Sequence, residues 1–255
     1  MKRIFFSIII IILVFVKCTE NTTETSVSDA AFNYLPTSTT GQIVKHKYYT
    51  LSYNEKYEQA EWVAYKATKK HLSRAQRKRP YFIYDPLVKT KSANYRNYKK
   101  SGYDRGHLVP AGDMRFDLAA YNDTFYTSNI SPQNHNFNAG IWNRLEGKVR
   151  YWTSKYGDLY VITGGVLEKR LAHIGREHVA VPNYFYKIIL DKNGKDSKAI
   201  AFLIPNKPSE KALYKYVVTI DELEKRTGID FFPALEDSLE NKLESSSSYA
   251  AWSFR

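Results

Sequence analysis

The strongest constraint on the fold is a set of strand-forming segments joined by a hairpin signal. Residues 159–163, 184–190 and 199–204 are rich in β-branched and aromatic side chains, which favour extended structure. The last two segments flank Asp191-Lys192-Asn193-Gly194, whose Asn-Gly pair is typical of a turn between antiparallel strands. Strands and helices do not alternate regularly, so the pattern predicts an α+β fold with a central antiparallel sheet flanked by helices.

Helical periodicity appears in two places. Between residues 138 and 155, apolar side chains recur on one face at helical spacing, and Asn138 lies on that same side. A second helix is expected at 221–227, with Thr219 or Asp221 as its N-cap and Gly228 at its end.

The composition is that of one enzyme-sized domain. The chain has 255 residues, of which 43% are hydrophobic, and a single cysteine, so its stability must come from core packing and not from an intrachain disulfide. We expect the globular domain at residues 42–255. Residues 18–41 are rich in Thr, Ser and Asn, and we interpret them as a flexible tether.

The N-terminal segment resembles an export signal. Residues 1–17 contain a basic start followed by an apolar stretch too short to span a bilayer comfortably. Cys18 follows directly, at the place where a bacterial lipoprotein carries its acylated cysteine, although Lys17 stands where a small residue is usual. We therefore predict an exported protein, tethered to a membrane through Cys18 or else secreted or periplasmic. Ordinary signal cleavage and an uncleaved anchor remain alternatives.

The net charge favours an anionic partner. The sequence has 38 Lys and Arg against 26 Asp and Glu, giving a formal charge of +12 and a pI near 9.5. Such an excess suits nucleic acid or a membrane surface. A solvated basic surface without a partner is the alternative.

The run from Tyr103 to Met114 contains the best candidate for a catalytic base. A neutral imidazole at His107 can take a proton from water near pH 7, and Arg105 beside it can donate two hydrogen bonds to a phosphate. The five other histidines are expected to be structural or on the surface: His46, His71, His135, His173 and His178.

The helix at 138–155 supplies the other candidates. The amide oxygen of Asn138 suits a hard Mg²⁺ ion, although an asparagine at this place can also be an ordinary N-cap. Glu146, two turns along, can accept hydrogen bonds from metal-bound water or lie on the surface. Arg150 can clamp a phosphate or belong to a solvated helix face.

These residues carry a resemblance to a known family. Asp104-Arg105-Gly106-His107, then Asn129 to Gln133, then Asn138 with Trp142, Leu145 and Glu146 resemble the DNA/RNA non-specific endonucleases of the ββα-metal (His-Me finger) superfamily, which includes endonuclease G. Shorter stretches extend the likeness over roughly residues 45 to 235.

The resemblance implies a role for each position. It makes His107 the general base, Asn138 the one direct protein ligand of Mg²⁺, with Mn²⁺ as a substitute, and Glu146 a support for the water shell. Asp104 would support the cation site from behind, and Arg105 would contact phosphate. The family also uses an upstream arginine, for which Arg79 is the first choice; Arg77 is its rival, as an alternative phosphate contact.

The function expected from this set is Mg²⁺-dependent, sequence-non-specific cleavage of DNA and RNA to 5′-phosphates and 3′-hydroxyls. Two other readings stay open. The same site can serve a small phosphodiester or nucleotide if the loop at 167–178 closes it, and a basic surface protein can bind extracellular nucleic acid without catalysis.

Overall fold

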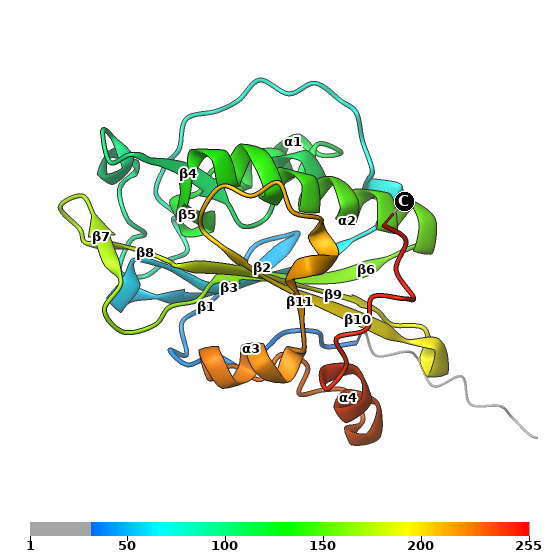
Figure 1. Ribbon diagram of the computed structural model, residues 1–255. Coiled ribbons are helices and arrows are strands. Elements are labelled where there is room, and N and C mark those ends of the chain that lie inside the picture. Colours follow the sequence, from blue (N-terminus) through cyan, green and yellow to red (C-terminus); the bar gives the residue numbers. More distant parts are fainter. Residues whose placement is uncertain (1–31, 255) are drawn as a thin grey trace, which may run out of the picture. The chain divides into compact units, whose positions relative to one another are not determined.

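A seven-stranded antiparallel sheet forms the centre of the structure, a computed structural model that describes residues 32–254 (Figure 1). Its strand order is β1-β2-β3-β6-β9-β10-β11, and two separate two-stranded sheets pair β4 with β5 and β7 with β8. This confirms the predicted α+β class with a large antiparallel sheet. The strands are β1 (Ile43–Lys45), β2 (Tyr49–Asn54), β3 (Gln59–Ala67), β4 (Tyr103–His107), β5 (Ile130–Asn134), β6 (Leu159–Gly165), β7 (Ala172–Ile174), β8 (Val179–Val181), β9 (Tyr184–Asp191), β10 (Lys198–Pro205) and β11 (Val217–Val218).

The predicted hairpin is present with a longer connection than expected. β9 and β10 pair antiparallel, with Asp191 opposite Lys198. The link is not a two-residue Asn-Gly turn, because a short 3-10 turn occupies Gly194–Asp196 and the Ser197 hydroxyl donates to the Gly194 carbonyl at 2.6 Å. The side-chain hydrogen bond stabilises this wider loop.

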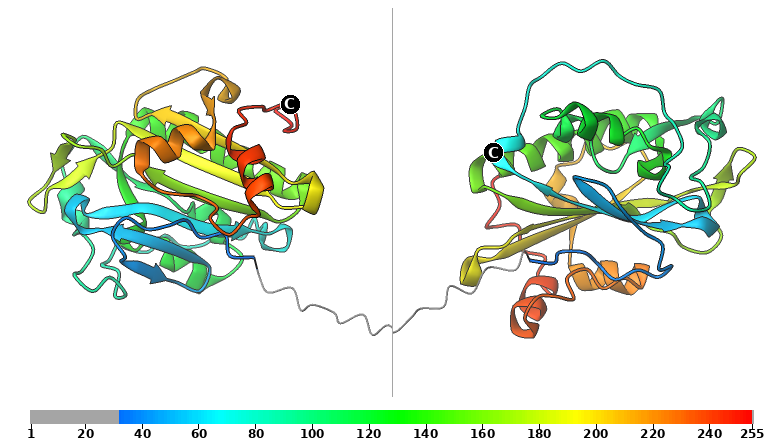
Figure 2. Two further views of the ribbon diagram at one scale, coloured as in Figure 1. Left: turned by 90° about the horizontal axis from the view of Figure 1, so that it is seen from below. Right: turned by 180° about the vertical axis from the view of Figure 1, so that it is seen from behind.

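Helices cover both faces of the sheet. α1 (Leu118–Asp123) and α2 (Asn143–Tyr156) lie on one face together with β4 and β5, and α3 (Ile220–Thr227) and α4 (Asp237–Glu244) lie on the other (Figures 1 and 2). Of the two N-cap candidates for α3, the structure uses Thr219, whose side chain accepts a hydrogen bond from the Glu222 amide. α3 ends at Gly228, which adopts a left-handed conformation at φ +72°.

The predicted helix at 138–155 is confirmed with one irregularity at its start. A π-helical segment, Phe137–Trp142, leads into α2, and Gly140 within it has non-helical angles of φ −96° and ψ −107°. The apolar side chains predicted to share one face are all buried: Ile141, Trp142, Leu145, Val149 and Trp152. The C-terminal tail docks on this layer, since the Trp252 and Trp152 ring centroids are 4.7 Å apart.

The compact unit that contains the sheet begins at Asn33, earlier than the expected boundary at residue 42. The Trp62 indole donates to the Thr37 carbonyl at 2.8 Å, and the Thr39 amide donates to the Glu61 carboxylate at 2.9 Å. Residues 33–41 are therefore bound to the domain by hydrogen bonds and are not a free tether. The expected signal at 1–17 and the anchor at Cys18 lie outside the described residues. Among residues 32–254, no helix combines the length and apolar character needed to cross a membrane.

Candidate active site

Two short strands and a helix bring the sequence candidates together. β4 carries Asp104, Arg105 and His107, and it pairs antiparallel with β5, which leads directly into the π-helical turn that carries Asn138. Asp104 and Asn138, more than 30 positions apart in the sequence, are thereby brought within hydrogen-bond distance, 2.9 Å.

Gly106 on β4 leaves room for a buried side chain of β5. A β-carbon at this position would lie 2.1 Å from the side chain of Gln133, which is fully buried on β5. Any larger residue would force the buried Gln133 side chain to move. This explains the glycine between Arg105 and His107 in the motif.

His107 is held in its neutral form. Its ring lies between Phe82 and Phe125, with centroids 5.8 Å and 5.0 Å away, and its Nε2 atom is buried without a hydrogen-bond partner among the described residues. Burial, with a smaller contribution from the positive charge of Arg79, lowers the pKa of His107 to about 3. The imidazole is therefore in the proton-accepting form throughout the physiological pH range.

The structure separates the two candidate upstream arginines. The Arg79 guanidinium lies 5.3 Å from the Phe82 ring and 5.6 Å from the Phe125 ring, the same two rings that flank His107. The Arg77 Nε atom instead donates to the Arg115 carbonyl at 3.0 Å. Only Arg79 is placed beside the imidazole.

Arg105 joins this group from β4. Its guanidinium lies 5.5 Å from the Phe82 ring and 5.7 Å from the Tyr95 ring, and its Nε atom donates to the Tyr95 carbonyl at 3.3 Å. These contacts fix the side chain through Nε and leave the terminal guanidinium nitrogens for a bidentate contact with an anion. Two arginines therefore converge on the surroundings of His107.

Asp104 orients the candidate metal ligand. One of its carboxylate oxygens accepts a hydrogen bond from Asn138 Nδ2 at 2.9 Å and contacts His135 Nδ1 at 3.0 Å. Because the amide nitrogen of Asn138 is held by Asp104, its amide oxygen is left as the free donor atom. A neutral oxygen of this kind fits a hard divalent cation that keeps most of its waters, so these residues fit Mg²⁺.

Glu146, on α2, lies among three charged side chains. No hydrogen bond or ion pair within residues 32–254 joins it to Asn138 or His107, and its nearest charges are Lys187, Asp113 and Arg150. Burial raises the pKa of Glu146 to about 7, while the positive charge of Lys187 opposes that rise. Lys187 is fully buried on β9, and its Nζ atom lies 4.7 Å from the centroid of the Trp142 ring. This Nζ atom has no hydrogen-bond partner within residues 32–254.

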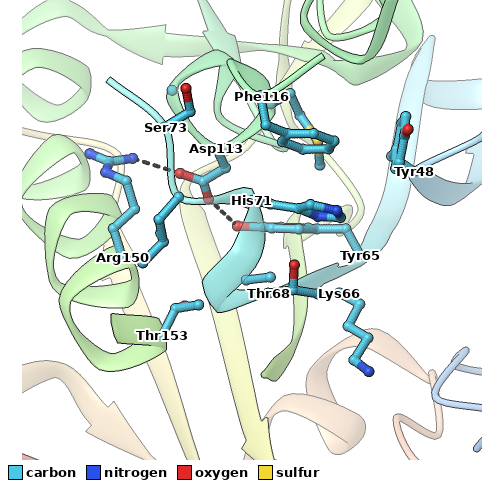
Figure 3. A pocket seen from close by; sticks show the side chains of 14 residues that line it. Tyr48, Tyr65, Lys66, Thr68, His71, Ser73, Asp113, Phe116, Arg150 and Thr153 are labelled. Carbon is cyan, nitrogen blue, oxygen red and sulfur yellow. Dashed lines mark hydrogen bonds and ion pairs between the residues drawn. The ribbon is translucent and has the colours of Figure 1, made fainter. Parts of the chain in front are cut away.

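Arg150 is bound to a neighbouring carboxylate. Asp113, on the 3-10 turn that follows β4, accepts hydrogen bonds from Arg150 Nη1 and from the Tyr65 hydroxyl, both at 2.7 Å (Figure 3). This network ties the turn after His107 to α2 and β3. Arg150 therefore holds the framework behind His107, and one of its guanidinium nitrogens is already engaged.

His135, expected to be structural or on the surface, is exposed and contacts Asp104. Two further contributors, Asp113 and Lys187, are not singled out by the sequence pattern. Lys187 did carry a signal, because it is a charged residue in the middle of the apolar run 184–190. The partners of Asp113, Arg150 on α2 and Tyr65 on β3, are far away in the sequence, so no local pattern predicts these contacts.

The fold and the site define a protein of the ββα-metal nuclease class. The chain belongs to the DNA/RNA non-specific endonuclease family, whose family model matches residues 27–238. This confirms the resemblance stated from the sequence.

Relatives with known names agree with this assignment. The chain is 38% identical over 210 residues to the mitochondrial nuclease EXOG of Danio rerio, covering 74% of this chain and 61% of that protein. It is 32% identical over 228 residues to nuclease C1 of Cunninghamella echinulata, covering 83% and 90%. The solved structure of the EndoG/EndoGI complex, described as showing the mechanism of EndoG inhibition, matches with a TM-score of 0.71 and 29% identity over 77% of this chain and 87% of that one. The chain spans only about three fifths of the length of the EXOG relatives.

The comparisons contradict the predicted location. The relatives include EXOG proteins and a yeast nuclease that are named as mitochondrial, so the expectation of an exported, lipid-anchored or periplasmic protein is wrong. The expectation rested on the composition of the N-terminal segment alone, which lies outside the described residues. The predicted lipid anchor on Cys18 depended on that location and is therefore not supported.

Proposed function

We propose that this chain is a Mg²⁺-dependent endonuclease that cleaves DNA and RNA without sequence preference, leaving 5′-phosphate and 3′-hydroxyl ends. The observation that carries this proposal is a neutral His107 flanked by Arg79 and Arg105, on the same strand as Asp104, which orients the Asn138 amide. The nuclease activities named for EXOG and nuclease C1 support it.

Each residue has a separate task in the proposed hydrolysis. His107 takes the proton from the attacking water, because its imidazole is kept neutral. Asn138 would hold a Mg²⁺ ion, which supplies charge stabilisation for the phosphoryl group and the departing 3′ oxygen; Mn²⁺ would substitute. Arg79 and Arg105 bind the phosphate and place it against the imidazole. Glu146 would support the water around the cation from further along α2.

Substrate binding also changes the environment of His107. The positive charge of Arg79 contributes to its low pKa, and a bound phosphate next to that arginine compensates for the repulsion. The imidazole therefore becomes a stronger base when nucleic acid is bound than in the free protein.

The proposed partner is the phosphate backbone of DNA or RNA. The long loop after β3 carries most of a basic cluster and arches above α1 and α2 (Figure 1). Contacts of this kind carry no sequence information, and affinity should fall by roughly one log unit per log of salt for each phosphate neutralised on duplex DNA. The basic cluster contains Lys69, Lys70, Arg74, Arg77, Lys78 and Arg79.

A cleavage assay tests the proposal directly. Closed-circular plasmid and RNA are incubated in Mg²⁺ or EDTA with the wild type, with Asn138→Ala and with a matched control, Asn136→Ala. Asn136 lies two residues from Asn138, and its side chain is exposed and makes no capping hydrogen bond. We expect nicking and RNA degradation that require Mg²⁺ and are lost in Asn138→Ala only. Binding without cleavage of either polymer would refute the proposal and favour a small phosphodiester substrate or a non-catalytic binding protein.

A further inference from the structure

Five carboxylates gather where α3 and α4 meet, on the face of the sheet opposite α1 and α2 (Figures 1 and 2). They form two groups that share one member, Glu244, and within each group one oxygen from every residue lies within 4.8 Å of the others. The first group comes from α3 and the end of α4, and the second from α4 and the loop before it. The five residues, called here the acidic cluster, are Asp221, Glu224, Asp230, Glu240 and Glu244.

Glu244 is the member that most needs a partner. It is the last residue of α4 and only 7% exposed, and one of its carboxylate oxygens is buried without a hydrogen bond to any described residue. The carbonyl end of a helix already carries partial negative charge, so a second negative charge there is unfavourable. A buried carboxylate without a partner is costly unless a positive group compensates for it.

The described chain supplies no such positive group. None of the ion pairs formed within residues 32–254 involves a member of the acidic cluster, and the one on α3 joins Arg226 to Glu222, outside the cluster. Among the described residues, the only hydrogen bond to the side chains of the cluster comes from the Phe231 amide, which donates to Glu224 at 2.9 Å. Burial and mutual repulsion raise the pKa of Glu244 to about 8 and raise the pKa of Glu224 as well.

The chemistry of the cluster selects the ion. Ca²⁺ accepts six to eight oxygen ligands in flexible arrangements, and several carboxylates are its usual protein ligands. Mg²⁺ prefers a strict octahedron with several retained waters and one or two carboxylates. A convergent set of carboxylates from two helices and a loop therefore fits Ca²⁺ better.

We propose that the acidic cluster binds a Ca²⁺ ion through Glu244 and that this ion fastens α3 to α4. Both helices contact β10 of the central sheet, so the ion would stabilise the layer that covers this face. The site is separate from Asn138, because the π-helical segment that carries Asn138 leads into α2, and α2 lies on the opposite face (Figure 1). The proposal concerns stability and goes beyond the proposed nuclease activity.

Thermal unfolding and calorimetric titration of the full chain test this proposal. The protein is freed of metal with EDTA, exchanged into chelator-free buffer and titrated with CaCl₂. The variants are Glu244→Gln, Glu222→Gln as a control on α3 outside the cluster, and Asn138→Ala to remove the proposed nuclease ligand. At Ca²⁺ concentrations about 100-fold above Kd, we expect the midpoint to rise by about 5 °C or more in the wild type and in both Glu222→Gln and Asn138→Ala.

The Glu244→Gln variant gives the decisive comparison. We expect it to fold, to be at least as stable as the wild type without Ca²⁺ because one repelling charge is gone, and to lose at least tenfold in Ca²⁺ affinity. An equal rise in Glu244→Gln, or no rise in the wild type, would overturn the proposal. Mg²⁺-dependent cleavage by Glu244→Gln reports on the nuclease separately, so the two proposals fail independently.

Discussion

If the hydrogen bond between Asp104 and Asn138 directs the metal ligand, its loss should raise the Mg²⁺ concentration that cleavage requires. Asp104→Ala removes the acceptor 2.9 Å from Asn138 Nδ2, so the amide is free to rotate and its oxygen is no longer directed. A hydrogen bond to a charged group contributes about 1.5–3 kcal/mol, and because the Asp104 side chain is 33% exposed, water replaces part of it. About 1.4–2 kcal/mol then remains, which corresponds to a roughly tenfold to thirtyfold weaker cation site.

The assay is the initial rate of plasmid nicking as a function of Mg²⁺ concentration. In Asp104→Ala we expect the half-saturating Mg²⁺ concentration to rise by that factor, while the rate at saturating Mg²⁺ stays within a few-fold of the wild type. His135→Ala removes the other, exposed partner of the same carboxylate and should shift the Mg²⁺ curve less. An unchanged Mg²⁺ requirement in Asp104→Ala would refute the positioning role, as would a rate that no Mg²⁺ concentration restores.

Three further changes probe the framework. The pKa of Glu244 is raised in the folded state, so between about pH 4.5 and pH 8 the folded protein holds a proton that the unfolded chain has released. Without Ca²⁺, the wild type should therefore lose stability relative to Glu244→Gln as the pH rises through this window. Thermal scans at several pH values measure this, and a stability difference that does not change with pH would contradict it. Tyr65→Phe removes a donor to the Asp113 carboxylate and should lower the free energy of unfolding in urea by about 1–2 kcal/mol, whereas no change would mean that water replaces the hydroxyl. Gly106→Ala drives a methyl group into the Gln133 side chain and should destabilise the domain by about 1–3 kcal/mol and reduce nicking. Wild-type stability would show that the Gln133 side chain moves aside freely.

The elements that local patterns determine were predictable from the sequence. The strands around 184–204 and the helix that begins near Asn138 follow from residue propensity and apolar periodicity, which act over a few neighbouring positions. The N-cap at Thr219 and the glycine after α3 were among the options, because capping chemistry is also local.

The parts that the sequence did not reveal depend on tertiary contacts. The position of Arg79 beside His107 depends on the two aromatic rings that both residues contact, which come from different segments. The surroundings of Glu146 depend on Lys187, which is buried on a strand far along the chain. No spacing rule links such residues, since their proximity results from the packing of α2 on the sheet.

The most direct test of the proposed chemistry compares binding and cleavage in His107→Ala. Binding to a fluorescent duplex is measured by anisotropy in EDTA, and single-turnover cleavage of the same duplex is measured in Mg²⁺. If His107 is the general base, the cleavage rate should fall by about 10²–10⁴-fold while the dissociation constant stays within a few-fold of the wild type. Cleavage that persists at the wild-type rate, or a loss of binding that matches the loss of cleavage, would contradict that role.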